Sequence, residues 1–472
     1  MPLKLFDTKE RTIKPFVPQD PKSVKMYTCG PTVYDYAHIG NFRTFVAEDL
    51  LRRTLKHLGY GVFQVMNLTD VDDKTIKGAL QENTTLAAFT QRYTDAFFDD
   101  LKTLSIDPAE AYPKATDYIP QMVEMIRTLL EKKLAYVSND GSVYFKLDTF
   151  PCYGCLSHLN LEELQLNASE RTRMDDYGKE HISDFVLWKR HERDRDGDIS
   201  WPSPWGEGRP GWHIECSVMA KGLLGNTIDI HAGGVDLIFP HHENEIAQSE
   251  SANGVLFSKY WFHVEHLLVD HKKMSKSLGN FYTLRTLIEK GFSGKAIRYL
   301  LLSVHYRSQL NFTKGSLEAS NQALARINDF HQRLLRSQNE ATGSESSGDI
   351  CSKAKIHFDE ALQEDLNISE ALAALFELIR EGNSLLDKKT ISPQGVKEIL
   401  DTLLTFDTVL ALLPTAQNSV PEEVLKLHQA RQDARGKKDF AQSDALRQKI
   451  SELGFIVEDG PKGSYVKPKS TH

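Results

Sequence analysis

The pattern that most restricts the fold lies near the N-terminus, where a strand, a turn, a helix and a second strand follow one another. Val24–Cys29 carries β-branched and aromatic residues typical of a strand and ends at Gly30-Pro31. Apolar residues then recur at helical spacing until Gly59, and Gly61–Met66 has the composition of the next strand. The pattern predicts the opening of a doubly wound sheet that gathers ligands at the carboxyl ends of its strands.

Two short motifs lie beside predicted strands. His38-Ile39-Gly40-Asn41 falls at the strand-to-helix turn, where a helix N-terminus offers N–H groups and a favourable dipole to phosphates. Gly40 lets the backbone approach a nucleotide closely. Lys273-Met274-Ser275-Lys276-Ser277 follows in the second half of the chain. Either motif alone arises by chance, but together and in this order they indicate a site that activates a carboxylic acid with ATP.

Four further residues form a candidate metal site. Cys29 ends the first strand, Cys216 lies far along the chain, and His241 and Glu245 are spaced to share one helix face. Two thiolates, an imidazole and a carboxylate suit tetrahedral zinc. Spacing alone leaves the assignment open, because a buried Cys is usually a small hydrophobe and the doubled His before a helix is often a cap or a surface feature.

The motifs carry a resemblance: the chain is similar to the cysteinyl-tRNA synthetases, a family of class I aminoacyl-tRNA synthetases. The family's first motif usually ends in a second histidine, whereas Asn41 here can donate a hydrogen bond but carries no charge. The resemblance weakens toward the C-terminus. The matching stretches are Tyr27–Phe45, Asn67–Lys74, Trp201–Ser217, Asp229–Ser249, Lys273–Asn280 and His305–Phe312.

The resemblance implies one zinc ion per chain, held by Cys29, Cys216, His241 and Glu245 and selecting the thiol of L-cysteine. A soft thiolate on zinc discriminates against a serine hydroxyl better than a pocket can, so no editing domain is needed. Catalytic zinc usually keeps an open position, so substrate must expand the shell or loosen a ligand, and Glu245 is the ligand expected to yield.

The resemblance also implies a substrate pocket near the thiol and the α-amino group. Its residues are Thr69, Trp212, His231 and Asp236, with the Asp236 carboxylate paired to the substrate ammonium. Trp212 fits plain core packing equally well.

For the chemistry, the resemblance implies that cysteine attacks the α-phosphorus of ATP and that the terminal 2′-OH of tRNA(Cys) then attacks the adenylate. The catalytic residues would be His38, Asn41, Lys273 and Lys276. Of these, His38 and Lys276, together with Gly40, would bind ATP with its Mg²⁺.

At 472 residues the chain is too long for one core. We expect a Rossmann-like α/β catalytic domain over residues 1–312, with an insertion at about 111–200. A helical bundle should follow over residues 313–415, because apolar residues recur on one helix face after Ser316. The residues of this face are Leu317, Leu324, Ile327 and Leu334.

The last segment, residues 421–472, resembles the family's small anticodon-binding domain. From Leu425 onward it holds ten Lys or Arg against six Asp or Glu, a net charge of +4 on a chain whose total is −8. The pattern predicts a helix begun by a cap at Asp439, an apolar stripe ending at Leu453, and a hairpin over residues 455–466. The candidates for reading anticodon bases are Arg435, Phe440, Asp444 and Asp459.

The sequence predicts no membrane span, no signal peptide, and a reducing, cytoplasmic setting. We also expect a monomer. The five cysteines form no disulfide framework. Cys152-Tyr153-Gly154-Cys155 has no second C-x-x-C to complete a zinc site, so we assign it no metal.

Two other functions stay open at this point. One is a ligase that joins activated cysteine to a small amine, which would have no use for the basic C-terminal segment. The other is an RNA-binding relative without catalysis, for which Asn41 is the only support.

Overall fold

The computed structural model describes residues 2–159, 184–275, 279–338, 340–414, 422–460 and 463–468. Its centre is a four-stranded sheet of order β10-β9-β3-β4 in which all neighbours are parallel. The strands are β3 (Val24–Thr28), β4 (Val62–Met66), β9 (Ile228–Gly234) and β10 (Ser258–Val264). The expected parallel sheet is therefore confirmed.

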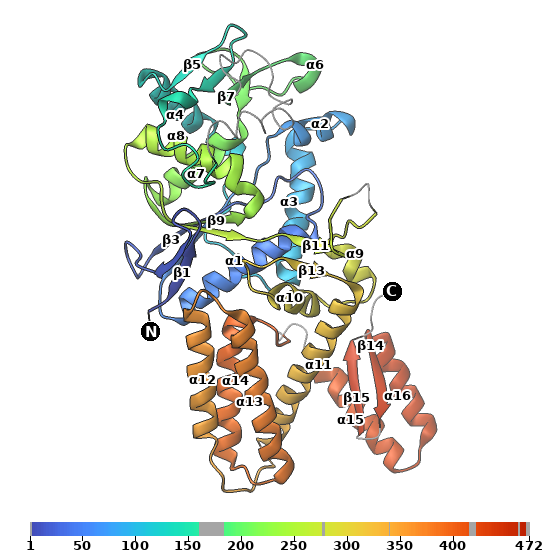
Figure 1. Ribbon diagram of the computed structural model, residues 1–472. Coiled ribbons are helices and arrows are strands. Elements are labelled where there is room, and N and C mark those ends of the chain that lie inside the picture. The colour runs from blue at the N-terminus through green and yellow to red at the C-terminus, as the bar shows by residue number, and fades with distance from the viewer. Residues whose placement is uncertain are drawn as a thin grey trace.

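Both faces of this sheet are covered, as β3 shows. Val24 and Met26 pack in the core on the side of α1 (Ile39–His57), whereas Tyr27 and Cys29 pack in a second core with α7 (Trp212–Leu224). Successive strand residues point to opposite faces, so one short strand contributes to both cores. Figure 1 shows α1 below the sheet and α7, α8 and α4 above it.

An antiparallel sheet of order β5-β6-β7-β8 lies in the inserted part of the chain. Its last strand lies past residue 200, the expected end of the insertion. Its strands are β5 (Ala135–Val137), β6 (Val143–Phe145), β7 (Phe185–Arg190) and β8 (Gly208–Pro210). Further helices of the catalytic part are α2 (Asp73–Gln81), α3 (Leu86–Thr103), α4 (Ile119–Glu131), α6 (Arg193–Asp196) and α8 (Glu243–Asn253), and α4 contacts β5.

Smaller elements complete the catalytic part. The N-terminal hairpin consists of β1 (Lys4–Asp7) and β2 (Thr12–Pro15). A second small sheet has the order β12-β11-β13. Its strands and the two helices near it are β11 (Leu267–Val269), β12 (Lys272–Lys273), α9 (Leu284–Glu289), α10 (Gly294–Leu302) and β13 (Leu310–Phe312).

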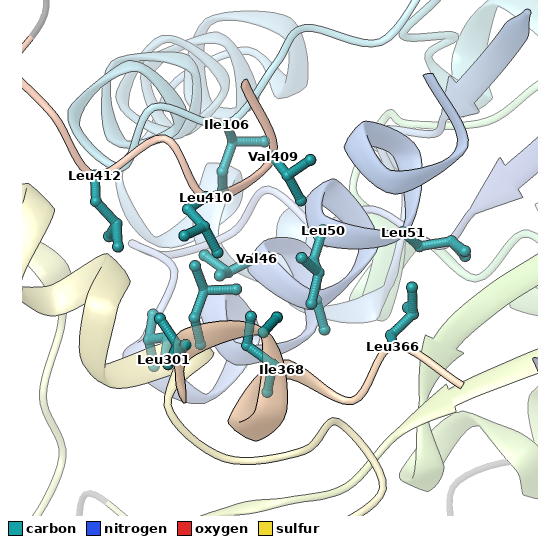
Figure 2. Close-up of a cluster of buried hydrophobic side chains, with 14 of the residues drawn as sticks. Val46, Leu50, Leu51, Ile106, Leu301, Leu366, Ile368, Val409, Leu410 and Leu412 are labelled. Carbon is teal, nitrogen blue, oxygen red and sulfur yellow. The ribbon is translucent and has the colours of Figure 1, made fainter. Parts of the chain in front are cut away.

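The helical bundle follows as expected. Its predicted apolar face, from Leu317 to Leu334, is buried along α11. Figure 2 shows where the bundle meets the catalytic part: Val46 and Leu50 of α1 lie among Leu301, Ile368 and Leu410. The helices are α11 (Lys314–Ser337), α12 (Gly348–Gln363), α13 (Ile368–Lys388) and α14 (Pro393–Leu410).

The C-terminal unit has the predicted helix and hairpin. Asp439 caps α16 by accepting a hydrogen bond from the Gln442 N–H at 3.0 Å. Ile450 is buried, but Leu453 is 43% exposed, so the predicted apolar stripe is wrong at its last residue, which follows the end of the helix. The elements are α15 (Glu422–Gly436), α16 (Phe440–Glu452), β14 (Phe455–Gly460) and β15 (Gly463–Pro468).

None of the helices in the described part of the chain combines the length and the apolar character needed to cross a bilayer.

A buried arginine joins the catalytic part to the bundle. Arg298 of α10 is fully buried and pairs with Asp49 of α1, Nη2 to Oδ2 at 2.5 Å. Its Nε donates to the Leu410 carbonyl at 2.8 Å and its Nη1 to the Leu104 carbonyl at 3.1 Å. Burial lowers the pKa of Arg298, so its charge depends on these partners.

Arg298→Met should leave Asp49 with Arg53 as its counter-charge and remove the donor to the Leu410 and Leu104 carbonyls, and it should lower the free energy of unfolding by about 1–3 kcal/mol. Urea titration followed by circular dichroism measures the change. Lys4→Met is the matched control: the Lys4–Glu364 pair is exposed, and its loss should cost about 0–1 kcal/mol. Equal effects of the two substitutions would show that the Arg298 junction does not hold the units together.

Candidate functional site

The candidate site lies where the order of the strands reverses. From β3 the chain crosses through α1 to β4 on one side, whereas β9 pairs with the other side of β3. Ligands bind at the carboxyl ends of parallel strands at such a reversal. Cys29 follows β3, Thr69 follows β4 and Asp236 follows β9, so candidates from three strands reach one edge of the sheet.

The four proposed metal ligands meet at this edge. The donor atoms of Cys29, Cys216, His241 and Glu245 all lie within 4.8 Å of one another, and all four residues are buried. They come from the end of β3, from α7, from the turn η5 (Ile238–His242) and from the first turn of α8. Two long stretches of sequence separate them, one between Cys29 and Cys216 and one between Cys216 and His241, which is why spacing alone could not select them.

The cluster has the electrostatic character of a metal site. Glu245 is fully buried, and among the described residues its Oε1 forms no hydrogen bond of good geometry, although His241 Nε2 lies 3.1 Å away. Burial raises the pKa of the Glu245 carboxyl and of the Cys29 thiol well above their usual values. A divalent cation would compensate the desolvated anionic donors, and a set of two sulfurs, one nitrogen and one oxygen fits zinc. These residues could therefore hold a metal.

A second, overlapping set of donors consists of Cys29, His231, His242 and Glu245. His242 Nε2 lies 3.3 Å from Cys29 Sγ, and His231 Nε2 lies 2.9 Å from Glu245 Oε2. The doubled histidine, for which a cap or a surface position was the ordinary expectation, is thus entirely buried.

The ring of His241 is fixed from two directions. Trp212 stacks on it with 4.2 Å between ring centroids, and His213 Nδ1 lies 2.9 Å from His241 Nδ1. The other ring nitrogen of His241, Nε2, faces Glu245 Oε1 at 3.1 Å. Burial lowers the pKa of His213 to about 3 and that of His241 well below its usual value, so both rings are neutral. Trp212 is 38% exposed, so it is not a plain core residue.

The other candidate substrate residues surround the cluster. Thr69 is buried, and its Oγ1 donates to Glu215 Oε2 at 3.2 Å. His231, on β9, contacts the proposed ligand Glu245 directly. Asp236 is exposed in the turn η4 (Val235–Leu237). Gly234 lies two residues earlier, and a Cβ there would lie 2.4 Å from Asp236 Oδ1, so a larger residue would displace the Asp236 carboxylate.

The first nucleotide motif forms a reciprocal cap at the start of α1. His38 Nδ1 accepts from the Asn41 N–H, and Asn41 Oδ1 accepts from the His38 N–H, both at 3.1 Å. Asn41, expected among the catalytic residues, thus makes a contact that no sequence pattern indicates. Its side-chain oxygen bonds the backbone of the turn, which orders the N-terminus of the helix.

The second motif lies against the first, although the two are far apart in sequence. A Cβ on Gly40 would lie 3.2 Å from Met274 Cε, and the Ile39 N–H donates to the Tyr282 carbonyl at 3.0 Å. Lys273 is exposed on β12. Lys276 lies outside the described residues, which omit 276–278.

The C-x-x-C segment has a structural role that the sequence analysis missed. Cys152 and Cys155, to which we assigned no metal, form a disulfide. The disulfide loop and the residues after it bind the start of α8: the N–H groups of Gly154, Leu156 and Ser157 donate to the Glu243 carboxylate at 2.8, 3.2 and 2.8 Å. No local pattern in the sequence signals this contact between distant segments.

The candidate anticodon residues all lie in the C-terminal unit. Arg435 is in the last turn of α15, and Asp444 is exposed on α16. Phe440 begins α16 with its ring 62% exposed, as a stacking surface for a base requires. Asp459 is in β14, opposite Ser464 of β15.

Comparisons with known proteins agree along the whole chain. The catalytic-domain model of the class I (C) tRNA synthetases matches residues 15–322, the DALR domain matches 357–414, and the cysteinyl-tRNA ligase anticodon-binding domain matches 417–466. A cysteine–tRNA ligase of Protochlamydia amoebophila is 53% identical over 470 residues, covering 99% of this chain and 98% of that protein. A cysteine–tRNA ligase of Chlamydia felis is 53% identical over 467 residues, with 98% of each chain covered.

Among solved structures, the fold is similar to that of Mycobacterium tuberculosis methionyl-tRNA synthetase in complex with methionyl-adenylate. The TM-score is 0.58 at 16% identity, over 83% of this chain and 90% of that chain. At this identity the likeness supports the fold.

Glu243→Gln should loosen the loop that the carboxylate holds. An amide group keeps one acceptor oxygen and turns an NH₂ toward backbone donors, so we expect a loss of about 1–3 kcal/mol. Hydrogen exchange of residues 150–158 should rise accordingly. Glu250→Gln is the control, because Glu250 accepts one backbone N–H, that of Phe257, at 3.2 Å. Unchanged protection in Glu243→Gln would contradict the assigned role.

Proposed function

Since this chain belongs to the class I cysteine–tRNA ligase family, we propose that it joins L-cysteine to tRNA(Cys) at the expense of ATP, through a cysteinyl-adenylate. One observation carries the choice of amino acid: two buried thiols, an imidazole and a carboxylate lie within 4.8 Å of one another at the ligand edge of the sheet. This donor set suits a metal that binds a substrate thiol.

Zinc is the metal that we propose for Cys29, Cys216, His241 and Glu245. When bound there, it would take the thiolate of cysteine as a soft ligand, a contact that a serine hydroxyl does not match. Glu245 is suited to yield its place, because its Oε2 already lies 2.9 Å from His231 Nε2. A released Glu245 carboxylate would therefore keep a buried partner.

The rest of the cysteine pocket consists of Thr69, Trp212, His231 and Asp236. The exposed Asp236 carboxylate would pair with the substrate ammonium. Trp212 covers one face of the His241 ring and would shield the ligand from water. With the amino group and the thiol held, the substrate carboxylate is free to face the nucleotide.

ATP would lie along the N-terminus of α1 at His38 and Gly40. The substrate carboxylate oxygen bonds to the α-phosphorus while the bond to the bridging oxygen of pyrophosphate breaks. Lys273 and Lys276 would hold the leaving phosphates together with Mg²⁺. Asn41 keeps the turn in its capped form, which would hold the N-terminus of the helix and its dipole beside the phosphates. The terminal 2′-OH of tRNA then attacks the adenylate carbonyl, and AMP leaves.

For the whole chain we propose the division into residues 1–312, 313–415 and 421–472, acting as a monomer in the cytoplasm. The last unit would read the anticodon with Arg435, Phe440, Asp444 and Asp459. The match of residues 417–466 to an anticodon-binding domain favours tRNA over a small amine as the acceptor. Charging of tRNA(Cys) with cysteine tests the proposal directly.

Purified protein should contain about one zinc ion per chain. Cys216→Ser should lower that content and raise the KM for cysteine, because a hydroxyl is a poor zinc ligand. Cys351→Ser is the matched control, since Cys351 is a buried thiol on α12 in the bundle. Metal analysis and amino-acid-dependent pyrophosphate exchange give the two readouts. Full zinc retention in both Cys29→Ser and Cys216→Ser would sink the metal assignment.

Removal of the chain after Pro421 should separate the two steps. Cysteine-dependent pyrophosphate exchange should largely survive, because the proposed nucleotide and metal residues all precede Phe312. Charging of tRNA should fall, because the segment with its net charge of +4 is lost. The comparison is charging of wild-type tRNA and of an anticodon mutant by the intact and the shortened protein. If the shortened protein charges at the full rate, the domain assignment fails.

A further inference from the structure

A line of four side chains runs from the N-terminal hairpin to the proposed metal site. Thr8 Oγ1 lies 2.8 Å from His263 Nδ1, and His263 Nε2 lies 2.8 Å from His242 Nδ1. His242 Nε2 in turn lies 3.3 Å from Cys29 Sγ. Every contact has hydrogen-bonding length, and the members come from the β1–β2 turn, β10, the turn before α8 and the end of β3.

The chemistry of these groups fixes the direction of the line. A neutral imidazole has one N–H and one lone pair, so each ring must donate on one side and accept on the other. A metal-bound Cys29 is a thiolate and can only accept. His242 Nε2 then carries the proton, His242 Nδ1 accepts from His263 Nε2, and His263 Nδ1 accepts from the Thr8 hydroxyl. All three contacts are satisfied with both rings neutral.

We propose that Thr8, His263 and His242 are positioning residues that hold an N–H donor on the sulfur of Cys29 and thereby tune metal retention. The inference rests on the proposed zinc site and deepens it. A hydrogen bond to a ligand sulfur draws electron density from it, and partners of this kind typically change metal affinity by about 10–100-fold.

The line also indicates that His242, which belongs to one of the two overlapping donor sets, is a hydrogen-bond donor and not a metal ligand. The set that contains His242 omits Cys216, a thiol that is 1% exposed beside Cys29. The set that contains His241 uses both thiols and leaves His241 Nδ1 to its partner His213. With His241 as the ligand, His242 serves as the donor to Cys29.

The Thr8 end of the line is held in place by the N-terminal hairpin, as a positioning role for Thr8 requires. The Thr8 N–H donates to the Trp261 carbonyl at 3.0 Å, and Asp7 Oδ1 accepts from the Trp261 N–H at 2.9 Å. His242 packs against His231 and Trp261, with ring centroids 4.3 and 5.3 Å apart. The hairpin thus holds the hydroxyl at a fixed place beside β10.

The test uses the full-length protein with Thr8→Val, Thr8→Ser and His263→Phe. Zinc affinity is measured by competition with a chelator, and the thiolate-to-metal charge-transfer band is recorded after substitution with Co²⁺. His263→Phe should weaken zinc binding about tenfold and shift the band, because the donor to His242 is lost. Thr8→Val should act in the same direction, and Thr8→Ser, which keeps the hydroxyl, should match the wild type.

The outcomes separate the inference from the proposed function. If the wild type binds zinc and charges tRNA(Cys) while Thr8→Val and His263→Phe keep its affinity and band, the positioning role alone is overturned. If Cys216→Ser leaves the band unchanged and His242→Phe abolishes it, His242 is a ligand and the inference fails. A wild-type protein without bound metal would overturn both. Should His263→Phe fail to fold, the Thr8→Val and Thr8→Ser pair decides.

Discussion

Desolvation of the cluster at the end of β3 is the constraint on which the site depends. Cys29, Cys216 and Glu245 are removed from water, and burial raises the pKa of Glu245 and Cys29. Such a group is tolerated only when its surroundings meet its hydrogen-bonding needs. The surroundings are histidines, and burial lowers the pKa of His231 and His263 to about 3. Neutral imidazoles supply donors without adding charge, so the charge at the site is left for a metal to balance.

The nucleotide turn depends on a different contact, the reciprocal cap at the start of α1. The same helix is held further along by Arg43, whose guanidinium donates to the carbonyls of Leu301, Val304 and His305 and whose pKa burial lowers to about 10. The helix also supplies Val46 and Leu50 to the junction with the bundle (Figure 2). One helix therefore links the turn proposed to face the phosphates, the second motif across from Gly40 and the support beneath the catalytic sheet.

Much of the fold followed from local patterns. The strand–helix–strand unit, the helical face from Leu317 to Leu334 and the C-terminal hairpin obey the periods of their elements, and each is present. The metal cluster needed the family resemblance, because its members are adjacent only after folding. The line from Thr8 through His263 could not be predicted from the sequence for the same reason. The hydrogen bonds of the Cys152–Cys155 segment to Glu243 could not be predicted either. The predicted apolar stripe of the C-terminal helix is wrong at Leu453 because the helix ends at Glu452. Past that end the helical period no longer directs a side chain inward.

The length of α1 has a mechanical consequence. Its 19 residues span about 28 Å, and the stretch from the cap at His38 to Asp49 contains no proline or break. Asp49 is clamped by Arg298, whose Nε also holds the last carbonyl of α14, from which the chain runs on to the C-terminal unit. Arg298 thus ties the end of α14 to the middle of α1, and the unbroken helix connects that junction to the turn at His38 about 11 residues away. The buried ion pair and the capped turn therefore share one stiff element.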